Sequence, residues 1–132
     1  KKVLHKPGSL NGKEYDHIKQ HPVVGEKICA PLHFAKPFLH IIRSHHEKFN
    51  GKGYPDGLAG EAIPIGSRIL GVVDAYDALI TLRPYRNSVP FDAAVEIIKS
   101  EALRGYWDPN IVKAFCEMMV NEKPEKREQI VC

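Results

Sequence analysis

Apolar residues recur with helical spacing along most of this chain. They predict helices over residues 12–20, 22–30, 37–47, 67–82, 91–101 and 111–120. No stretch alternates between apolar and polar residues for long enough to predict a strand. We therefore expect an all-α fold of about six helices in one domain, residues 1–121, followed by a polar tail, residues 122–132.

Prolines predict where several of these helices begin and end. Pro22, Pro37 and Pro109 are placed to open helices, because proline is tolerated in the first helical turn. Pro31 and Pro84 are placed to end them, because the residue before a proline avoids the helical region of backbone space. Residues 48–66 are rich in glycine and proline and predict a long loop, and loops of that length inside a compact domain are usually functional.

The helix predicted over residues 67–82 is almost continuously apolar, which indicates a central helix buried on all sides. Asp74 lies within it. An ionised carboxylate in such surroundings costs several kcal/mol unless it is paired or bound to a metal. We favour metal binding for Asp74, and the alternative is a buried ion pair with Arg43 or Arg68.

Seven histidines are many for 132 residues. His45 and His46 stand at the end of a predicted apolar helix, where adjacent side chains point about 100° apart. If both lie on a helix, they can bind two different ions of a cluster. Alternatively, one of them is a metal ligand and the other only lies beside it. His21, just before Pro22, could point inward. Imidazole and carboxylate ligands suit iron, manganese, zinc or nickel, and without a nearby cysteine a zinc–thiolate site is not expected.

Composition excludes several other classes of protein. The net charge is +3, and the sequence has no long run of lysine and arginine of the kind that binds duplex DNA. Three scattered cysteines form no disulfide pattern, so we expect a reduced cytoplasmic setting with Cys29 and Cys116 as apolar packing residues. No apolar run reaches the roughly 20 residues of a membrane span.

The loop and the segments around it resemble the HD-GYP family of the HD-domain metal phosphohydrolases. Residues 45–64 resemble the family's signature, and the resemblance spans roughly residues 3–118. It continues through residues 6–10, 21–22, 68–79, 83–86 and 106–109.

The resemblance implies an HD-domain-like helical bundle that hydrolyses cyclic di-GMP to pGpG or GMP in bacterial signalling. It also implies a centre of two or three divalent ions, such as iron or manganese. The matching metal ligands are His21, His45, His46 and Asp74. The matching substrate-binding residues are Gly53, Tyr54, Arg83 and Arg86.

One part of the family pattern is missing from this sequence. The family's His-Asp dyad and a nearby lysine lie upstream of the turn that matches residues 6–8, and no His-Asp dipeptide occurs here. We therefore assign no catalytic residue and expect the 132-residue chain to be an inactive portion of a phosphodiesterase. The alternative is a degenerate module that binds cyclic di-GMP or a GGDEF-domain partner without catalysis.

Further expectations concern the larger protein and its assembly. The parent is expected to carry a receiver or sensor domain, as in a response regulator. Without the family's N-terminal helices, apolar surface near His21 and His45 would be uncovered, so a homodimer is possible. Action on a different nucleotide is a third reading, which the loop and residues 83–86 disfavour.

Overall fold

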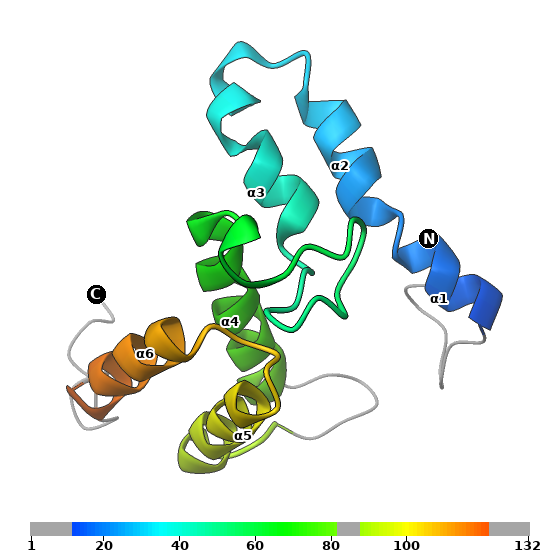
Figure 1. The fold of residues 1–132 in the computed structure, drawn as a ribbon. Helices are drawn as coiled ribbons and strands as arrows, with labels where there is room; N and C mark the ends of the chain where they lie inside the picture. Colours follow the sequence, from blue (N-terminus) through cyan, green and yellow to red (C-terminus); the bar gives the residue numbers. More distant parts are fainter. Residues whose placement is uncertain (1–11, 82–87, 122–132) are drawn as a thin grey trace, which may run out of the picture.

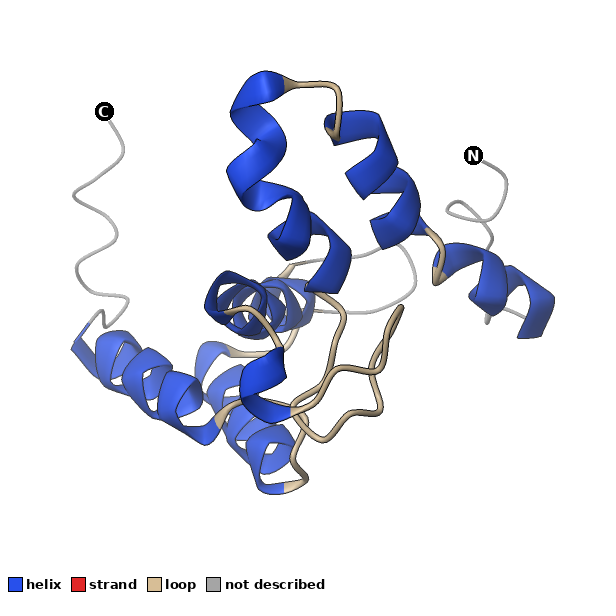
Figure 2. Cartoon of the chain, turned by 45° about the horizontal axis from the view of Figure 1, so that its top comes forward, coloured by secondary structure: helices blue, strands red, loops and turns tan. Residues whose placement is uncertain are grey.

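The computed structural model describes residues 12–81 and 88–121, which form helices and connecting loops with no strand among them (Figures 1 and 2). The α-helices are α1 (Gly12–Ile18), α2 (His21–Cys29), α3 (Leu39–Ser44), α4 (Ile65–Ile80), α5 (Phe91–Leu103) and α6 (Pro109–Asn121). Two short 3₁₀ helices are η1 (His33–Phe38) and η2 (Gly60–Ala62). The predicted all-α class is confirmed, and the described residues contain six α-helices.

Helices α2 and α3 lie side by side as an antiparallel pair that projects from the rest of the molecule (Figure 1). The two helices approach closely, because a Cβ added to Gly25 of α2 would lie 3.2 Å from Ile42 of α3. Pro22 stands in the first turn of α2, as predicted. This pairing brings the beginning of α2 next to the end of α3.

Helix α3 is shorter than the sequence predicted. Pro37 lies inside η1 instead of opening a long helix, and α3 ends at Ser44. His45 is the C-cap residue, so His46 and Glu47 lie beyond the helix. The expected helix over residues 37–47 was therefore wrong at both ends.

The hydrophobic core lies between α4, α5 and α6. Its buried residues come from these helices and from the turn before α6: Val72, Tyr76, Ala94, Val95, Ile98, Trp107, Val112, Phe115 and Met119. Asp108 in that turn is buried and accepts a hydrogen bond from the Asn110 backbone N–H at the start of α6. Cys116, half-buried, packs against the core, and Cys29 is half-buried on α2.

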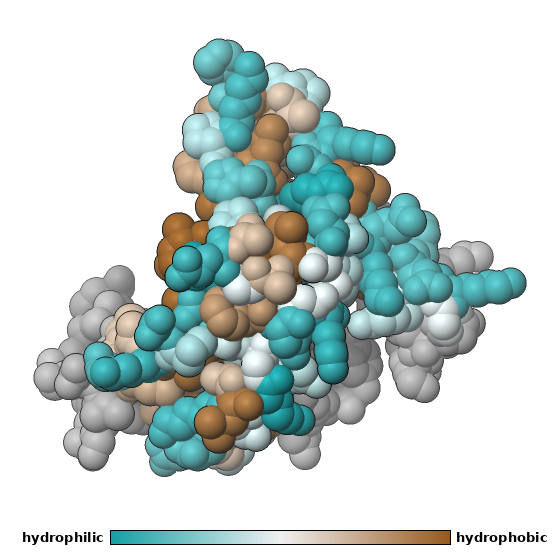
Figure 3. Space-filling view, viewed as in Figure 1, coloured by the Kyte–Doolittle hydropathy of each residue, from teal (hydrophilic) through white to brown (hydrophobic). Residues whose placement is uncertain are grey.

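Helix α4 is not buried on all sides, which corrects the prediction from its composition. One face packs on the core, but Ile65, Ile69, Leu70 and Val73 are 40–57% exposed. Asp74 is exposed as well. In the described part of the chain, other helices cover only part of the circumference of α4. Figure 3 shows hydrophobic residues, coloured brown, on the surface of the molecule among hydrophilic ones.

Several predictions fall outside the described residues. These are the turn at residues 6–8, the arginines Arg83 and Arg86, and the tail at 122–132. The domain boundary at residue 121 accordingly stays a prediction.

Within the described ranges, no helix combines the length and the apolar character needed to cross a bilayer.

Candidate metal centre and the loop around it

Three histidines converge where α2 begins and α3 ends. His21 opens α2, and His45 and His46 follow the last residue of α3. One ligand nitrogen from each ring lies within 4.8 Å of the others. The antiparallel pairing of α2 and α3 is what joins residues so far apart in the sequence.

Backbone carbonyls orient two of these rings. Nδ1 of His21 lies 2.7 Å from the carbonyl oxygen of Ile18, and Nδ1 of His45 lies 2.7 Å from that of Ile42. A carbonyl oxygen only accepts, so each Nδ1 carries the proton. In a neutral ring the Nε2 atom then carries the lone pair, which is the form of histidine that binds metals.

Two separations between Nε2 atoms match those of ligands on a single divalent ion. The separation is 3.4 Å between His21 and His45, and 3.1 Å between His21 and His46. With bonds of about 2.1 Å, two nitrogens lie about 3.4 Å apart around a tetrahedral ion and about 3.0 Å apart at cis positions of an octahedral ion. Facing lone pairs at these distances repel unless a proton or a cation lies between them. The donor set therefore fits a metal.

His46 is neutral at physiological pH. Burial, followed by the neighbouring charges of His45, His21 and Lys48, lowers the pKa of His46 to about 4. The ring of Tyr54 stacks on the ring of His46, with centroids 4.9 Å apart and planes inclined by 28°. Burial, with smaller effects of Tyr15 and Asp74, raises the pKa of Tyr54 to about 12, so its phenol stays protonated.

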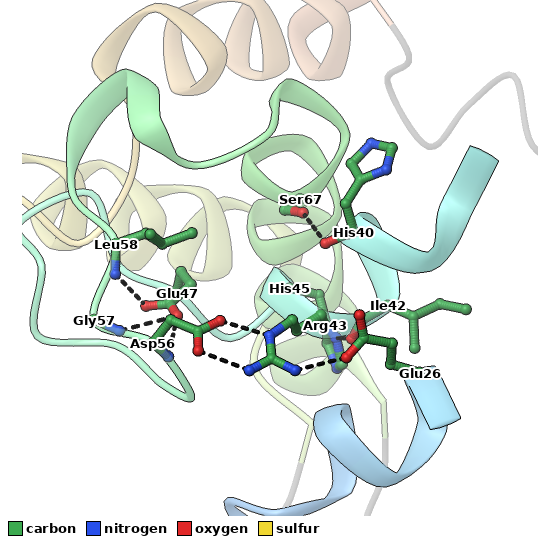
Figure 4. Close-up of polar contacts among 10 residues, drawn as sticks. All are labelled: Glu26, His40, Ile42, Arg43, His45, Glu47, Asp56, Gly57, Leu58 and Ser67. Carbon is green, nitrogen blue, oxygen red and sulfur yellow. Dashed lines mark hydrogen bonds and ion pairs between the residues drawn. The ribbon is translucent and has the colours of Figure 1, made fainter. Parts of the chain in front are cut away.

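Glu47 holds the glycine-rich loop against the end of α3. Its side chain is buried, and its two carboxylate oxygens accept backbone N–H groups of Asp56, Gly57 and Leu58 at 2.7–3.1 Å (Figure 4). These three hydrogen bonds offset the cost of burying the charge. The sequence analysis missed this role, because a buried carboxylate that binds loop backbone leaves no periodic signal.

Gly53 is the position where this loop comes closest to the backbone after α3. A Cβ on Gly53 would lie 2.3 Å from the Lys48 nitrogen and 2.4 Å from the Glu47 Cα. No side chain fits there. Gly53 thus lets the next residue, Tyr54, reach the ring of His46.

Asp74 does not belong to the group of ligand atoms that the three histidines form. Among the described residues, the cluster of mutually close ligand atoms contains the three histidines alone. The Asp74 charge nevertheless reaches Tyr54 and Lys48. Burial lowers the pKa of Lys48, and the negative charges of Glu101 and Asp74 act in the opposite direction. Lys48 also lies 3.4 Å from the centre of the Trp107 ring.

The alternative ion-pair partners of Asp74 bind other carboxylates. Arg68 lies 2.6 Å from Asp108, and Arg43 binds Glu26 and Asp56. Neither arginine forms these ion pairs with Asp74. The buried ion pair considered from the sequence was therefore wrong, and the reason is that Asp74 faces solvent in the described part of the chain.

Comparison with known proteins shows which family this chain is similar to. The HD domain family matches residues 1–111. The chain is 40% identical over 114 residues to "Cyclic di-GMP phosphodiesterase response regulator RpfG" of Xanthomonas campestris, covering 85% of this chain and 30% of that protein. It is 41% identical over 128 residues to a "Cyclic di-GMP phosphodiesterase" of Vibrio cholerae, covering 92% of this chain and 25% of that protein.

A solved structure has the same fold. It is a HDG"Y"P protein from Bdellovibrio bacteriovorus, with a TM-score of 0.67 and 23% identity, covering 88% of this chain and 37% of the other.

The fold and site together define an all-helical domain with a three-imidazole face beside a glycine-rich loop. The chain belongs to the HD domain family, and its resemblance to HD-GYP proteins is confirmed. It spans less than a third of the length of the two relatives.

Proposed function

We propose that this chain is part of a metal-dependent phosphodiesterase that hydrolyses cyclic di-GMP to pGpG or GMP. The observation that carries the proposal is the convergence of three imidazoles on one point beside the loop that bears Tyr54. The relatives named as cyclic di-GMP phosphodiesterases supply the substrate class.

Within this proposal, His21, His45 and His46 hold one divalent ion, of which iron and manganese are the leading candidates. Such an ion supplies charge neutralisation at phosphoryl oxygens and activates water for attack. Asp74 is proposed as a further ligand on the strength of the family resemblance, and its charge acts on Tyr54 and Lys48 beside the histidines.

The loop side of the site is proposed to receive the nucleotide. Tyr54 presents an aromatic ring, protonated at neutral pH, whose hydroxyl can donate a hydrogen bond. Gly53 removes the side chain that would push this ring away from His46. Arg83 and Arg86 are proposed to bind phosphate and guanine groups, since a guanidinium offers paired donors to both.

For the 132-residue chain alone we propose binding with little or no turnover. Phosphodiester hydrolysis is commonly catalysed by two ions about 3.5–4 Å apart. Three imidazoles and Asp74 are too few ligands to hold two ions firmly. The sequence also contains no His-Asp dipeptide, which the family pattern places at the centre of the metal cluster.

The test measures binding and hydrolysis separately. Calorimetry would titrate Mn²⁺ into the metal-free chain and then cyclic di-GMP into the loaded chain, and chromatography would follow pGpG. We expect metal-dependent nucleotide binding and no product. A cyclic dinucleotide in which one guanine is replaced by adenine is the specificity control. Binding of neither metal nor nucleotide would refute the proposal.

A binding module without catalysis is the second candidate for the longer protein of which this chain is proposed to be a part. The parental protein distinguishes the two candidates. If the longer protein also binds cyclic di-GMP with Mn²⁺ but releases no pGpG, the binding module is correct. The GGDEF-domain partner, the receiver or sensor domain, the homodimer and the cytoplasmic location stay predictions.

A further inference from the structure

Arg43 joins the three chain segments that build the proposed metal site. Its Nη1 donates to the Glu26 carboxylate on α2 at 2.6 Å. Its Nε and Nη2 donate to the two oxygens of Asp56, on the loop, at 2.7 and 2.8 Å (Figure 4). Arg43 itself lies on α3. One guanidinium therefore binds one carboxylate on each of its two neighbouring segments.

Each of these segments also carries a residue of the site. Helix α2 begins with His21, and α3 leads directly into His45 and His46. The loop carries Tyr54, two residues before Asp56, and Tyr54 stacks on His46. Any change in the separation of α2, α3 and the loop changes the separation of these side chains.

The contacts of Arg43 are geometrically specific. A guanidinium offers donors in a rigid planar fork, and paired donation to one carboxylate fixes both distance and orientation. Asp56 is held from a second side as well, because its backbone N–H donates to Glu47. Arg43 and Glu47 flank His45 and His46 in the sequence, and both bind the same turn of the loop.

The same contacts add little to the stability of the fold. The side chains of Arg43, Glu26 and Asp56 are 28–35% exposed. Ion pairs at such exposure contribute little, because water screens them. A metal site, in contrast, requires its ligands to stay within about 0.5 Å of the binding geometry. The arrangement is therefore suited to positioning more than to stabilisation.

We propose that Arg43, through Glu26 and Asp56, is a positioning residue that sets the separation of His21 from His45 and His46. The inference rests on the three-histidine site proposed above. It assigns Arg43 no contact with the ion or the nucleotide. Its loss leaves all three imidazoles present but lets α2 and the loop shift relative to α3.

The test uses Co²⁺ as the probe in the full 132-residue chain, because the visible absorption of bound Co²⁺ reports the number and geometry of its ligands. We expect Arg43→Met to weaken Co²⁺ binding about tenfold, the lower end of what partners outside the ligand shell contribute. The absorption spectrum should change as well. Arg43→Lys keeps the charge without the fork and should restore only part of the affinity.

Two further variants cover the case in which Arg43→Met does not fold. Glu26→Gln and Asp56→Asn each remove one carboxylate charge and keep the side-chain shape. Each should weaken Co²⁺ binding with little change in melting temperature, and together they should be non-additive because they share Arg43. The matched control is Lys99→Met, which removes the exposed Lys99–Glu96 ion pair on α5 and should leave the Co²⁺ spectrum unchanged.

The outcomes separate this inference from the proposed site. If the unaltered chain binds Co²⁺ and the Arg43, Glu26 and Asp56 variants bind it equally well with the same spectrum, the positioning role is wrong and the site stands. If the unaltered chain binds no Co²⁺, the three-histidine site is wrong and the positioning role falls with it.

Discussion

The Nε2 atom of His21 lies 3.4 Å from the Nε2 atom of His45, although the two residues are 24 positions apart in the sequence. Each ring donates its Nδ1 proton to a carbonyl three residues earlier, so the two lone pairs face each other. The two lone pairs repel each other, and a cation bound between the rings would relieve this repulsion.

Removing one of these rings should abolish tight metal binding. We expect His21→Ala to weaken Mn²⁺ or Co²⁺ binding by more than about 100-fold, because loss even of a partner outside the ligand shell costs 10–100-fold. Calorimetry measures the change. His17→Ala, an exposed histidine on α1, is the control and should bind as the unaltered chain does. Equal losses in both variants would contradict the three-histidine site.

Neutralising Glu47 should loosen the loop. Glu47→Gln replaces a buried carboxylate that accepts three backbone N–H groups, and an amide has a single oxygen to accept them. We expect the free energy of unfolding to fall by about 2–3 kcal/mol, as for hydrogen bonds to charged groups. Urea denaturation measures it. Glu61→Gln, exposed on η2, should change little, and a Glu47 variant as stable as that control would contradict the assignment.

A methyl group at position 53 should not be tolerated. In Gly53→Ala the new Cβ would lie 2.3 Å from the Lys48 nitrogen, so the loop must move away from the end of α3. We expect a loss of about 1–3 kcal/mol from overpacking, read as a lower melting temperature, together with weaker nucleotide binding. Gly12→Ala has no atom within 4 Å of its Cβ and is the matched control. A loop that accepts alanine at 53 without either effect would show that the close packing is not required.

The Arg43–Asp56 pair should respond to acid. Its hydrogen bond lowers the pKa of Asp56, so the ionised form stabilises the folded state. That contribution is present above the unfolded pKa of about 3.9 and is lost as the pH falls through the lower folded value. Because water screens this exposed pair, the stability difference between the unaltered chain and Asp56→Asn should be small from about pH 5 to 8 and should vanish below about pH 4. Denaturation at a series of pH values tests this, and a difference that grows in acid would contradict it.

The helices were predictable where prolines and apolar periodicity agree. Pro22 and Pro109 open α2 and α6 as expected, and α5 begins at Phe91 as predicted. Pro37 misled the prediction, because a 3₁₀ turn also accepts proline and here η1 contains it. His45 and His46 follow the last residue of this shorter α3, and the ligand nitrogens of both lie close to that of His21.

The histidines were found from the sequence, but their supporting contacts were not. The resemblance singled out His21, His45, His46 and Tyr54, and the structure brings these four together. Arg43 and Glu47 act through partners 9–17 residues away, and such contacts depend on how the loop folds back. Apolar composition also overstated the burial of α4, because composition does not report which neighbours cover a helix.

The hydrogen bonds described above for the three histidines, Arg43 and Glu47 all lie between residues 18 and 58, whereas the buried core joins α4, α5 and α6. Short chain closures cost little conformational entropy, and contacts between near sequence neighbours form early in folding. We therefore expect the ligand face to need no contact with α5 or α6 in order to form. An ion bound there would link the start of α2 to the end of α3 independently of the core.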